Sequence, residues 1–349
     1  MKYIFVYTTP AVVLFSLFVG GWYSYTAIIV LFGLIPFLEL FTVGSTKNLN
    51  AEEERLIEQN PVYDFLLYSL VPLQYLIAVV FLLKITNYDI PLYEKIGLTT
   101  AFGMACGVLG INAAHELGHR KTKFERFLSK LLLASTQYLH FYIEHNRGHH
   151  KNVSTDEDPA SARYGESIYY FFGRSIINSW FSAWKLEKKR LSLMNVSWWS
   201  FKNEMLRFQL IQLLILALVF FSFNLNTVFF YLFGAGIGIL LLEAVNYIEH
   251  YGLRRLKKNG RYERTMPIHS WNSNHPIGRL LLLELSRHSD HHYISSRKYP
   301  LLRHFDESPQ MPTGYPGMML LALVPPLWFK VMHKRIEKYR KTESGLALG

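Results

Sequence analysis

The sequence predicts an all-α protein that crosses a membrane six times and carries a histidine-rich metal site in a helical cap at one end of its spans. Two observations support this fold class. Half of the 349 residues are apolar although 37 are Lys or Arg, and the apolar residues form uncharged runs of about twenty that alternate with basic segments. In addition, nine of the 14 histidines fall into four short clusters. We expect residues 1–349 to form a single integral-membrane domain.

The apolar runs come in hairpins. Gly20-Gly21 separates the first two runs, and a short polar turn that contains Pro91 separates the third from the fourth. A soluble all-α core does not need repeated runs that are long enough to span a bilayer. The predicted spans are residues 3–20, 22–43, 64–83, 93–114, 209–223 and 227–247.

Three further segments are expected at the membrane surface. Residues 126–143 are apolar but contain Lys130, Gln137 and His140, so they predict a helix that lies at the interface or dips into it. Residues 151–208 are basic and aromatic, which suits a segment resting on lipid headgroups. Residues 317–332 contain a central Pro-Pro pair and are interpreted as a surface-docked segment rather than a seventh span.

The histidine clusters follow these spans. They read His-Glu-Leu-Gly-His at residues 115–119, Glu-His-Asn-Arg-Gly-His-His at 144–150, Asn-Tyr-Ile-Glu-His-Tyr-Gly-Leu at 246–253 and Arg-His-Ser-Asp-His-His at 287–292. Histidines three or four residues apart share one face of a helix, as a common metal ion requires. The candidate metal ligands are His115, His119, His145, His149, His150, His250, His288, His291 and His292.

Each cluster also contains a carboxylate, which can accept the outer ring N–H of a ligating histidine and fix its orientation. Glu243 lies two helical turns before His250 on the same face, and an ionisable group inside a span is a functional candidate. The supporting candidates are Glu116, Glu144, Glu249, Asp290 and Glu243. We expect ordinary structural or surface roles for the other histidines, with His269 and His275 the first exceptions: His140, His269, His275, His304 and His333.

The metal is chosen by counting ligands. Residues 115–119 also satisfy His-Glu-x-x-His, the zinc protease motif. A catalytic zinc takes three protein ligands, which would leave most clustered histidines unused. Nine nitrogens suit two six-coordinate ions, and imidazole ligation suits iron, copper or zinc, so the count favours a pair of irons. A metal transporter would instead place ionisable residues in mid-membrane.

Iron at the end of apolar helices implies oxygen chemistry on an apolar substrate in a pocket that excludes water. The sequence has no flavin, nicotinamide or Cys₄ iron motif, and its single cysteine is Cys106. Two electrons per turnover must therefore come from a separate redox partner. The net charge of +11 favours lipid or an acidic protein partner over nucleic acid, because no nucleic-acid motif is present.

At this point the residues resemble a known family. The first, second and fourth clusters are similar to the three histidine boxes of the membrane fatty-acid-desaturase-like superfamily. Residues 246–253 resemble the additional motif of its bacterial alkane 1-monooxygenase branch, as do residues 271–276 and 302–310. The likeness covers roughly residues 60–332. Ser286 departs from the pattern, because the family more often has Gln there.

The resemblance implies an enzyme of the bacterial inner (cytoplasmic) membrane with its active site on the cytoplasmic side. It would use two iron ions and O₂ to convert n-alkanes from the bilayer into 1-alkanols. Rubredoxin and rubredoxin reductase would be separate chains that supply electrons. The nine histidines named above would be the iron ligands. Two alternatives use the same site: a fatty-acyl desaturase or hydroxylase, and a monooxygenase of alkyl-aromatic side chains.

Overall fold

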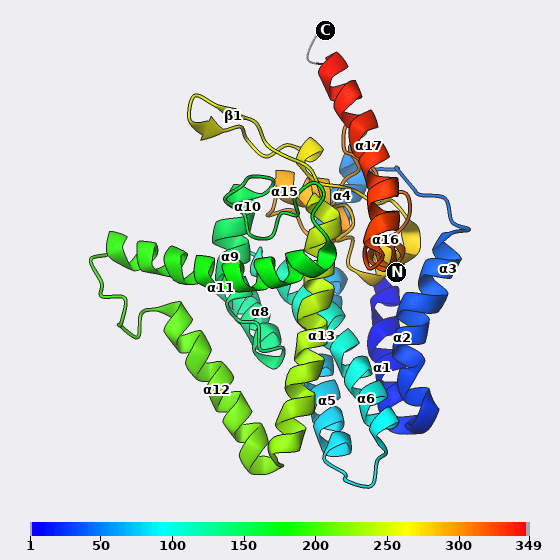
Figure 1. The fold of residues 1–349 in the computed structure, drawn as a ribbon, viewed down its shortest axis with the longest axis vertical. Helices are drawn as coiled ribbons and strands as arrows, with labels where there is room; N and C mark the ends of the chain where they lie inside the picture. Colours follow the sequence, from blue (N-terminus) through cyan, green and yellow to red (C-terminus); the bar gives the residue numbers. More distant parts are fainter. Residues whose placement is uncertain (1, 347–349) are drawn as a thin grey trace.

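The computed structural model describes residues 2–346, with side chains as far as residue 340. Within that range the only strands are β1 (Lys257–Lys258) and β2 (Arg261–Tyr262), which pair antiparallel as a hairpin. The rest of the regular structure is helical. Long helices run side by side through one part of the molecule, and short helices and loops cap their shared end (Figure 1).

The predicted six spans are confirmed as six helices that are long and apolar enough to cross a membrane. They are Lys2–Val19 (η1, Lys2–Tyr7, and α1, Thr8–Val19), Gly21–Glu39 (η2, Gly21–Tyr25; α2, Thr26–Ile29; η3, Val30–Leu34; α3, Ile35–Glu39), Val62–Ile85 (α5), Leu92–Gly118 (α6, Leu92–Ala105; η4, Cys106–Asn112; α7, Ala113–Gly118), Glu204–Ser222 (α12) and Leu225–His250 (α13). The protein is therefore an integral membrane protein.

Polar side chains fix where the later helices begin. Asn203 Oδ1 accepts from the backbone N–H groups of Met205 and Leu206, and so caps the start of α12. Asn224 caps α13 in the same way through Thr227 N. Each cap satisfies backbone donors that a helix start leaves unpaired. The hairpin turn between α12 and α13 is therefore short and well defined.

The fourth and sixth spans pack closely because glycines remove side chains from their contact. A Cβ on Gly238 would lie 2.5 Å from Cys106 Cβ, and a Cβ on Gly234 would lie 2.5 Å from Phe102 Cδ1. A Cβ on Gly103 would lie 2.6 Å from Ile237 Cβ. These glycines let the helix axes approach, as small residues commonly do between membrane helices. The contact joins the two spans that carry His115 and His250.

The segment predicted to lie at the interface or dip into it forms a helix and a return loop. α8 (Lys123–Ser135) is capped by Thr122 and is followed by Gln137, whose φ is 56°. Gln212 donates to the carbonyl oxygen of Gln137 at 2.7 Å. Since α12 begins at Glu204, this contact lies eight residues, roughly 12 Å, into the span. The chain then returns through α9 (Phe141–Glu144) to the second histidine cluster.

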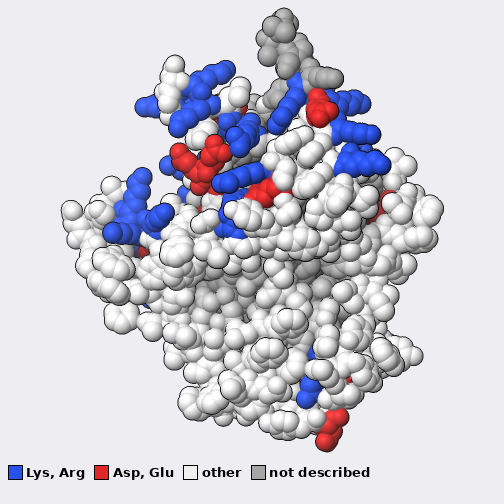
Figure 2. Space-filling view, viewed as in Figure 1, with Lys and Arg blue, Asp and Glu red and all other residues white. Residues whose placement is uncertain are grey.

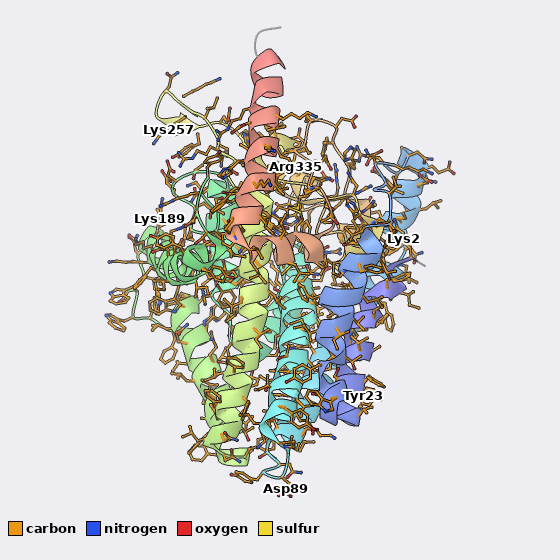
Figure 3. All side chains as sticks on the ribbon, turned by 45° about the vertical axis from the view of Figure 1, so that its right-hand side comes forward. Lys2, Tyr23, Asp89, Lys189, Lys257 and Arg335 are labelled. Atoms are coloured by element: carbon orange, nitrogen blue, oxygen red, sulfur yellow. The ribbon has the colours of Figure 1, made fainter. Side chains whose placement is uncertain are left out.

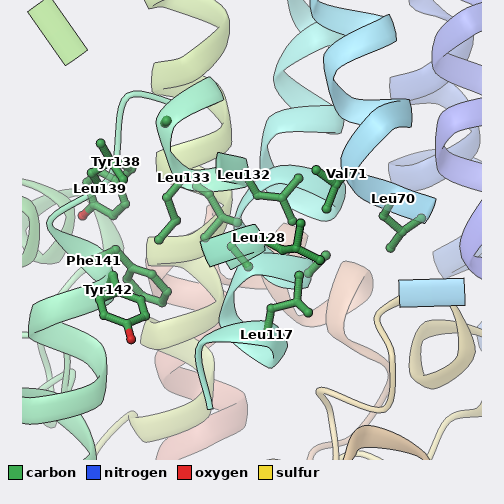
Figure 4. Close-up of a cluster of buried hydrophobic side chains, with 14 of the residues drawn as sticks. Leu70, Val71, Leu117, Leu128, Leu132, Leu133, Tyr138, Leu139, Phe141 and Tyr142 are labelled. Carbon is green, nitrogen blue, oxygen red and sulfur yellow. The ribbon is translucent and has the colours of Figure 1, made fainter. Parts of the chain in front are cut away.

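A buried apolar cluster anchors this dipping segment. Leu128, Leu132 and Leu133 of α8 lie among side chains of α5 and Leu117 of α7 (Figure 4). Leu117 and Leu132 have no exposed surface. Because Leu117 lies between His115 and His119, burial of this leucine fixes the helix face on which both histidines project.

The basic, aromatic segment forms α11 (Ile168–Leu193), which crosses the ends of the spans rather than running with them (Figure 1). The span that follows it, α12, is the least packed, with only Glu204, Met205, Phe208 and Val219 buried. Most of α12 therefore presents apolar side chains to the surrounding membrane.

The remaining elements complete the cap. They are α4 (Ala51–Gln59), η5 (His145–His149), α10 (His150–Asn152), η6 (Pro267–His269), α14 (Pro276–Leu281), α15 (His288–Tyr293), η7 (Tyr299–Leu301), α16 (Tyr315–Ala322) and α17 (Pro325–Leu346). Residues 317–332, predicted to dock on the surface, lie in α16 and α17, and Trp328 and Met332 are fully buried against the cap.

Charge separates the two ends of the molecule. Lys, Arg, Asp and Glu side chains gather around the cap, a broad uncharged belt follows, and a few charges reappear at the far end (Figure 2). Lys189, Lys257 and Arg335 lie at the capped end, whereas Asp89 and Tyr23 lie at the opposite end (Figure 3). This is the distribution expected for spans that cross hydrocarbon.

Candidate metal centre

The structure brings the nine predicted histidines together in two groups of ring nitrogens. We call them the five-histidine group and the four-histidine group. Within each group the candidate ligand atoms all lie within 4.8 Å of one another. The five-histidine group contains His115, His119, His145, His150 and His291; the four-histidine group contains His149, His250, His288 and His292.

Two spans deliver the first and third clusters. His115 and His119 stand one α-helical turn apart at the end of the fourth span and belong to the same group, as their spacing predicts. His250 is the last residue of α13 and has no exposed surface. The helix ends thus place imidazoles at the boundary between the spans and the cap.

The second cluster departs from the predicted pairing. The i, i+4 spacing placed His145 and His149 on one face, but residues 145–149 form a π-helix, η5. A π-turn brings residues five apart into register, and such turns are frequent at functional sites. His145 therefore joins His150 in the five-histidine group, and His149 joins the other.

The last cluster is also divided, so the expectation that its three rings share one ion is wrong. His288 and His292 are four residues apart on α15 and lie in the four-histidine group. His291 projects to the five-histidine group. One short helix therefore serves both groups and ties their relative positions together.

The ring nitrogens of the five-histidine group lie so close together that hydrogen bonds between them cannot account for all of the contacts. His145 Nε2 lies 3.0 Å from both His119 Nε2 and His150 Nε2, and His150 Nε2 lies 3.1 Å from His291 Nε2. An imidazole nitrogen has one in-plane site, either a lone pair or an N–H, so it cannot form hydrogen bonds to two such neighbours. A shared cation accepts all the lone pairs at once. The donor set therefore fits a metal ion.

The four-histidine group has the same character. His149 Nε2 lies 3.2 Å from His292 Nε2, and His288 Nε2 lies 3.2 Å from His250 Nε2. The outer Nδ1 atoms of His288 and His292 are buried without a hydrogen-bond partner among the described residues. These rings are positioned by packing rather than by hydrogen bonds from both nitrogens.

Burial keeps these rings in the form that binds metals. Burial lowers the pKa of His119 to about 3, and it lowers the pKa of His145 and His150 well below the ordinary value, with neighbouring imidazoles adding to the effect. The pKa values of His291 and His292 fall for the same reasons. The neutral imidazole that results at pH 7 has a free lone pair for a metal.

One supporting carboxylate was missed by sequence reasoning. His149 Nδ1 donates to Asp158 Oδ2 at 2.9 Å, and Ser161 Oγ donates to the same oxygen. Asp158 is buried, so this contact fixes the His149 ring and leaves Nε2 for the metal. Asp158 lies in a loop nine residues after His149, and no spacing rule points to it.

Glu249 is the one predicted carboxylate that contacts a clustered histidine. Its Oε2 lies 3.1 Å from His288 Nε2, and its Oε1 accepts from Tyr315 Oη at 2.7 Å. It therefore approaches the metal-facing nitrogen rather than the outer ring N–H that the sequence suggested. A carboxylate oxygen lies beside the imidazole donors of the four-histidine group.

The other predicted carboxylates have other partners in the structure. Glu116 accepts from Arg120 and from Tyr299 N, and Asp290 accepts from Arg297 and from Arg303 N. These bonds tie the first and last clusters to the loop around residues 297–303, so both carboxylates hold the cap around the site.

The last two predicted carboxylates, Glu144 and Glu243, are buried and form hydrogen bonds with side chains outside the histidine groups. Glu144 accepts from Ser182 Oγ at 3.4 Å, and burial raises its pKa well above the ordinary value. Glu243 accepts from Tyr138 Oη at 3.0 Å and from Asn246 Nδ2 at 3.4 Å. Glu243 is 2% exposed, and its three-residue network joins α13 to the return loop after α8.

The leftover histidines lie outside both groups. His269 is bonded to Glu263 and Met266 N, His304 to Asn274 and Asp306, and His333 to Tyr251. His275 contacts Ser273 Oγ, and the Nε2 of His140 is buried without a partner among the described residues. None of the five belongs to a metal-binding group found among the described residues.

An apolar cavity leads from the spans to the histidines. His115, His145, His288 and Glu249 line it, together with Asn112 and Asn246. On the fourth and sixth spans the lining runs from Gly107 to His115 and from Leu241 to Glu249, so these polar residues mark its cap-side end. Its walls are aliphatic and aromatic side chains of the second, fourth and sixth spans and of α14 and α16. The main apolar wall residues are Leu31, Phe32, Val108, Leu241, Leu242, Val245, Leu281, Leu282, Leu285 and Met319.

Membrane helices that carry two buried groups of imidazoles at the end of an apolar cavity define a histidine-rich membrane metalloprotein. The sequence profile of the family described as fatty acid desaturase matches residues 96–322. An alkane 1-monooxygenase of Acinetobacter baylyi is 40% identical over 316 residues, which is 90% of this chain and 77% of that protein. An alkane 1-monooxygenase of Pseudomonas putida is 38% identical over 343 residues, 96% of this chain and 85% of that protein.

The chain belongs to the fatty acid desaturase family and, within it, to the alkane 1-monooxygenases. It is accordingly an oxidoreductase. A more distant relative is the xylene/toluene monooxygenase hydroxylase component XylM of Pseudomonas putida, 28% identical over 281 residues, which is 78% of this chain and 73% of that protein.

Proposed function

We propose that this protein hydroxylates the terminal methyl group of n-alkanes, with the balance RH + O₂ + 2H⁺ + 2e⁻ → ROH + H₂O. The observation that carries the proposal is the apolar cavity that ends against His115, His145 and His288. His115 and His145 belong to the five-histidine group and His288 to the four-histidine group, so a molecule in the cavity would lie beside both groups. An n-alkane has no polar handle, and an apolar cavity between spans suits it.

We propose iron for both ion positions, with the nine histidines as ligands. Five imidazoles in one group exceed the four ligands of a zinc site. The five-histidine and four-histidine groups would each hold one ion, because the candidate ligand atoms within each group lie within 4.8 Å of one another. When bound, the iron pair supplies the reductive activation of O₂.

The protein's own contribution is position and exclusion of water. The aliphatic wall of the cavity holds a straight chain by shape, so that its end rather than its middle lies near the histidines. Glu249, Asn112 and Asn246 are the polar groups at that end and can bind the product hydroxyl. Asp158 holds His149, and α15 keeps the two groups at a fixed separation.

We propose that rubredoxin delivers the electrons, itself reduced by rubredoxin reductase. The basic cap, where Lys and Arg side chains gather (Figure 2), supports an acidic carrier. Lys257 and Lys258 are exposed on the hairpin, Lys151 directly follows His150, and Arg254 pairs with Asp156. The same excess of positive charge supports a cytoplasmic location of the cap in the bacterial inner membrane, because cytoplasmic loops are rich in Lys and Arg.

The test is product analysis together with metal analysis of the purified protein. The protein is supplied with rubredoxin, its reductase and NAD(P)H, and is given octane, hexadecane, p-xylene and an acyl thioester in separate reactions. Primary alcohol from an n-alkane and about two irons per chain are expected. Alkene from the thioester without alcohol, oxidation of xylene alone, or stoichiometric zinc in an active protein would each contradict the proposal.

A further inference from the structure

A basic cavity lies at the start of the fifth span and shares no lining residue with the apolar cavity. It is formed where α8 begins, where η5 turns and where α12 enters the membrane, and its volume is about 320 Å³. Since a water molecule occupies about 30 Å³ in the liquid, this space admits a group much larger than one water. Its charged lining residues are Lys123, Arg126, Lys130, Arg147 and Glu204.

The cations around this cavity exceed the carboxylates. Glu204 accepts from Lys130 at 2.9 Å and from Arg147 at 2.5 Å, so one carboxylate faces two cations. Lys123 and Arg126 form no ion pair within the part of the chain whose side chains are described. Four cations and one carboxylate leave a net charge of +3 at the rim. A group that carries several anionic oxygens is the complementary ligand.

The spacing along α8 turns these side chains toward one cavity. Lys123, Arg126 and Lys130 follow each other at three and four residues, so they share one helix face. Tyr142 closes the inner side, and the ammonium of Lys130 lies 4.5 Å from the centre of its ring. The cavity is thus a basic recess with an aromatic wall, formed by three chain segments rather than by a single loop.

The recess lies beside Glu204, the first residue of the fifth span, and exposed aromatic side chains border it. Phe124 and Phe127 are each 57% exposed beside Lys123 and Arg126, a pairing of aromatic and basic residues found at membrane interfaces. Below the recess, α12 exposes Leu210, Leu213 and Leu214 along the span. An anion that enters here can place hydrocarbon chains along α12.

We propose that this recess binds the phosphate headgroup of an anionic phospholipid whose acyl chains lie against α12. Basic recesses between membrane helices are known to bind such headgroups. The carboxylates of a soluble carrier suit the recess less well, because two exposed phenylalanines and a sparsely packed span border it. A lipid satisfies both the cations and the apolar surface.

The position of Arg147 links this lipid site to the metal centre. Arg147 lies in η5 between His145 and His149, and its guanidinium also donates to the fully buried Glu187 at 2.9 Å. A phosphate in the recess adds an anion beside this guanidinium and holds the turn that separates the two histidine groups. Anionic lipid is therefore expected to steady the second cluster without entering the active site.

The test measures lipid retained by the purified full-length protein. Wild type and K123Q/R126Q are delipidated, titrated with phosphatidylglycerol in detergent, and examined by native mass spectrometry. The matched control is K188Q/K189Q, which removes two exposed cations of α11 outside the recess. Thermal melting confirms that each variant is folded, and Lys123→Gln alone repeats the test with the smallest change.

Wild type is expected to retain one phosphatidylglycerol per chain, and K123Q/R126Q is expected to bind it about 25-fold more weakly, since each cation near an anionic headgroup contributes a factor of about five. The control and R126K are expected to bind as wild type does. Equal retention by wild type and K123Q/R126Q would overturn the proposal, and so would an equal loss in K188Q/K189Q. Displacement of the lipid by excess inorganic phosphate would assign the recess to free phosphate instead. Each result is independent of the alkane reaction.

Discussion

His145 and His150 place their Nε2 atoms 3.0 Å apart, although His149 is the residue one α-helical turn from His145. The π-turn of η5 produces this relationship by adding one residue to the turn. Its consequence is that two neighbouring residues, His149 and His150, belong to different histidine groups. The second cluster therefore contributes to both groups rather than a pair of rings to one of them.

The first prediction concerns metal content. His145→Ala removes the nitrogen shared by two Nε2 contacts in the five-histidine group, and His149→Ala removes a ring of the four-histidine group. Each change is expected to lower iron from about two to about one per chain while the protein still inserts in the membrane. Elemental analysis of the purified variants measures this. His333→Gln, outside both groups, should keep the wild-type content; an iron-replete, fully active H145A would contradict the ligand assignment.

The second prediction tests Asp158 as the residue that orients His149. Asp158→Asn keeps the shape but removes the carboxylate, and loss of such a partner costs about 10- to 100-fold in metal affinity. Chelator competition measures the affinity. Asp156→Asn is the matched control, because Asp156 lies on the same loop with an exposed side chain paired to Arg254. If both variants lose iron equally, the hydrogen bond to His149 is not the cause.

The third prediction concerns the length of the apolar cavity. Leu242 lines the cavity, whereas Leu240 on the same helix faces outward and is 41% exposed. Leu242→Phe fills part of the cavity and is expected to shift the preferred n-alkane toward shorter chains. Leu240→Phe should leave the preference unchanged. Competition between octane and hexadecane in one reaction gives the ratio of kcat/KM directly, and an unchanged ratio in L242F would exclude this cavity as the substrate site.

The fourth prediction concerns pH. Burial lowers the pKa of His140 to about 4 in the folded protein, and the unfolded value is near 6.5. Between these values the unfolded chain binds more protons, so stability falls as the pH drops from 6.5 to 4, by on the order of 3 kcal/mol for this one residue. His140→Phe should remove this part of the pH dependence. Denaturant unfolding of metal-depleted wild type and variant at several pH values measures the difference, and parallel curves would contradict the assignment.

The fifth prediction concerns electron delivery. The exposed hairpin cations Lys257 and Lys258 lie on the cap, and their attraction for an acidic carrier is screened over about 8–10 Å at physiological salt. K257E/K258E is expected to slow reduction by rubredoxin and to flatten its dependence on ionic strength. Stopped-flow reduction at increasing salt tests this, with K188Q/K189Q as control. Wild-type rates that do not change with salt would count against electrostatic docking.

The spans were predictable because hydrocarbon requires long uncharged helices, and their sequence signal is local. The residues at which the spans begin and end were less predictable. The fifth span was expected from residue 209, but the helix begins at Glu204, because Asn203 caps it and Arg207 reaches the surface. The absence of charged residues indicates which part of a helix lies in hydrocarbon, but it does not indicate where the helix begins. The capping residue indicates where the helix begins, and its sequence signal is weaker.

The metal-site residues were predictable from type and spacing, whereas their grouping was not. An α-helical spacing rule assigns His145 to His149 and cannot detect a π-turn, which depends on packing around η5. Asp158 was not predicted for a related reason, because its contact with His149 depends on the fold of a loop and not on a helical spacing. Distances along the sequence identify partners within a helix and miss partners between segments.

The close contact between the fourth and sixth spans determines which substitutions the protein tolerates there. Gly238 and Cys106 touch in the membrane, roughly 18 Å and 14 Å along their helices from His250 and His115. This glycine contact sets how closely the two helices approach, and their cap-side ends carry His250 and His115, one histidine of each group. A methyl group added at Gly238 would therefore change the distance between these two histidines, although Gly238 belongs to neither histidine group and does not line the apolar cavity.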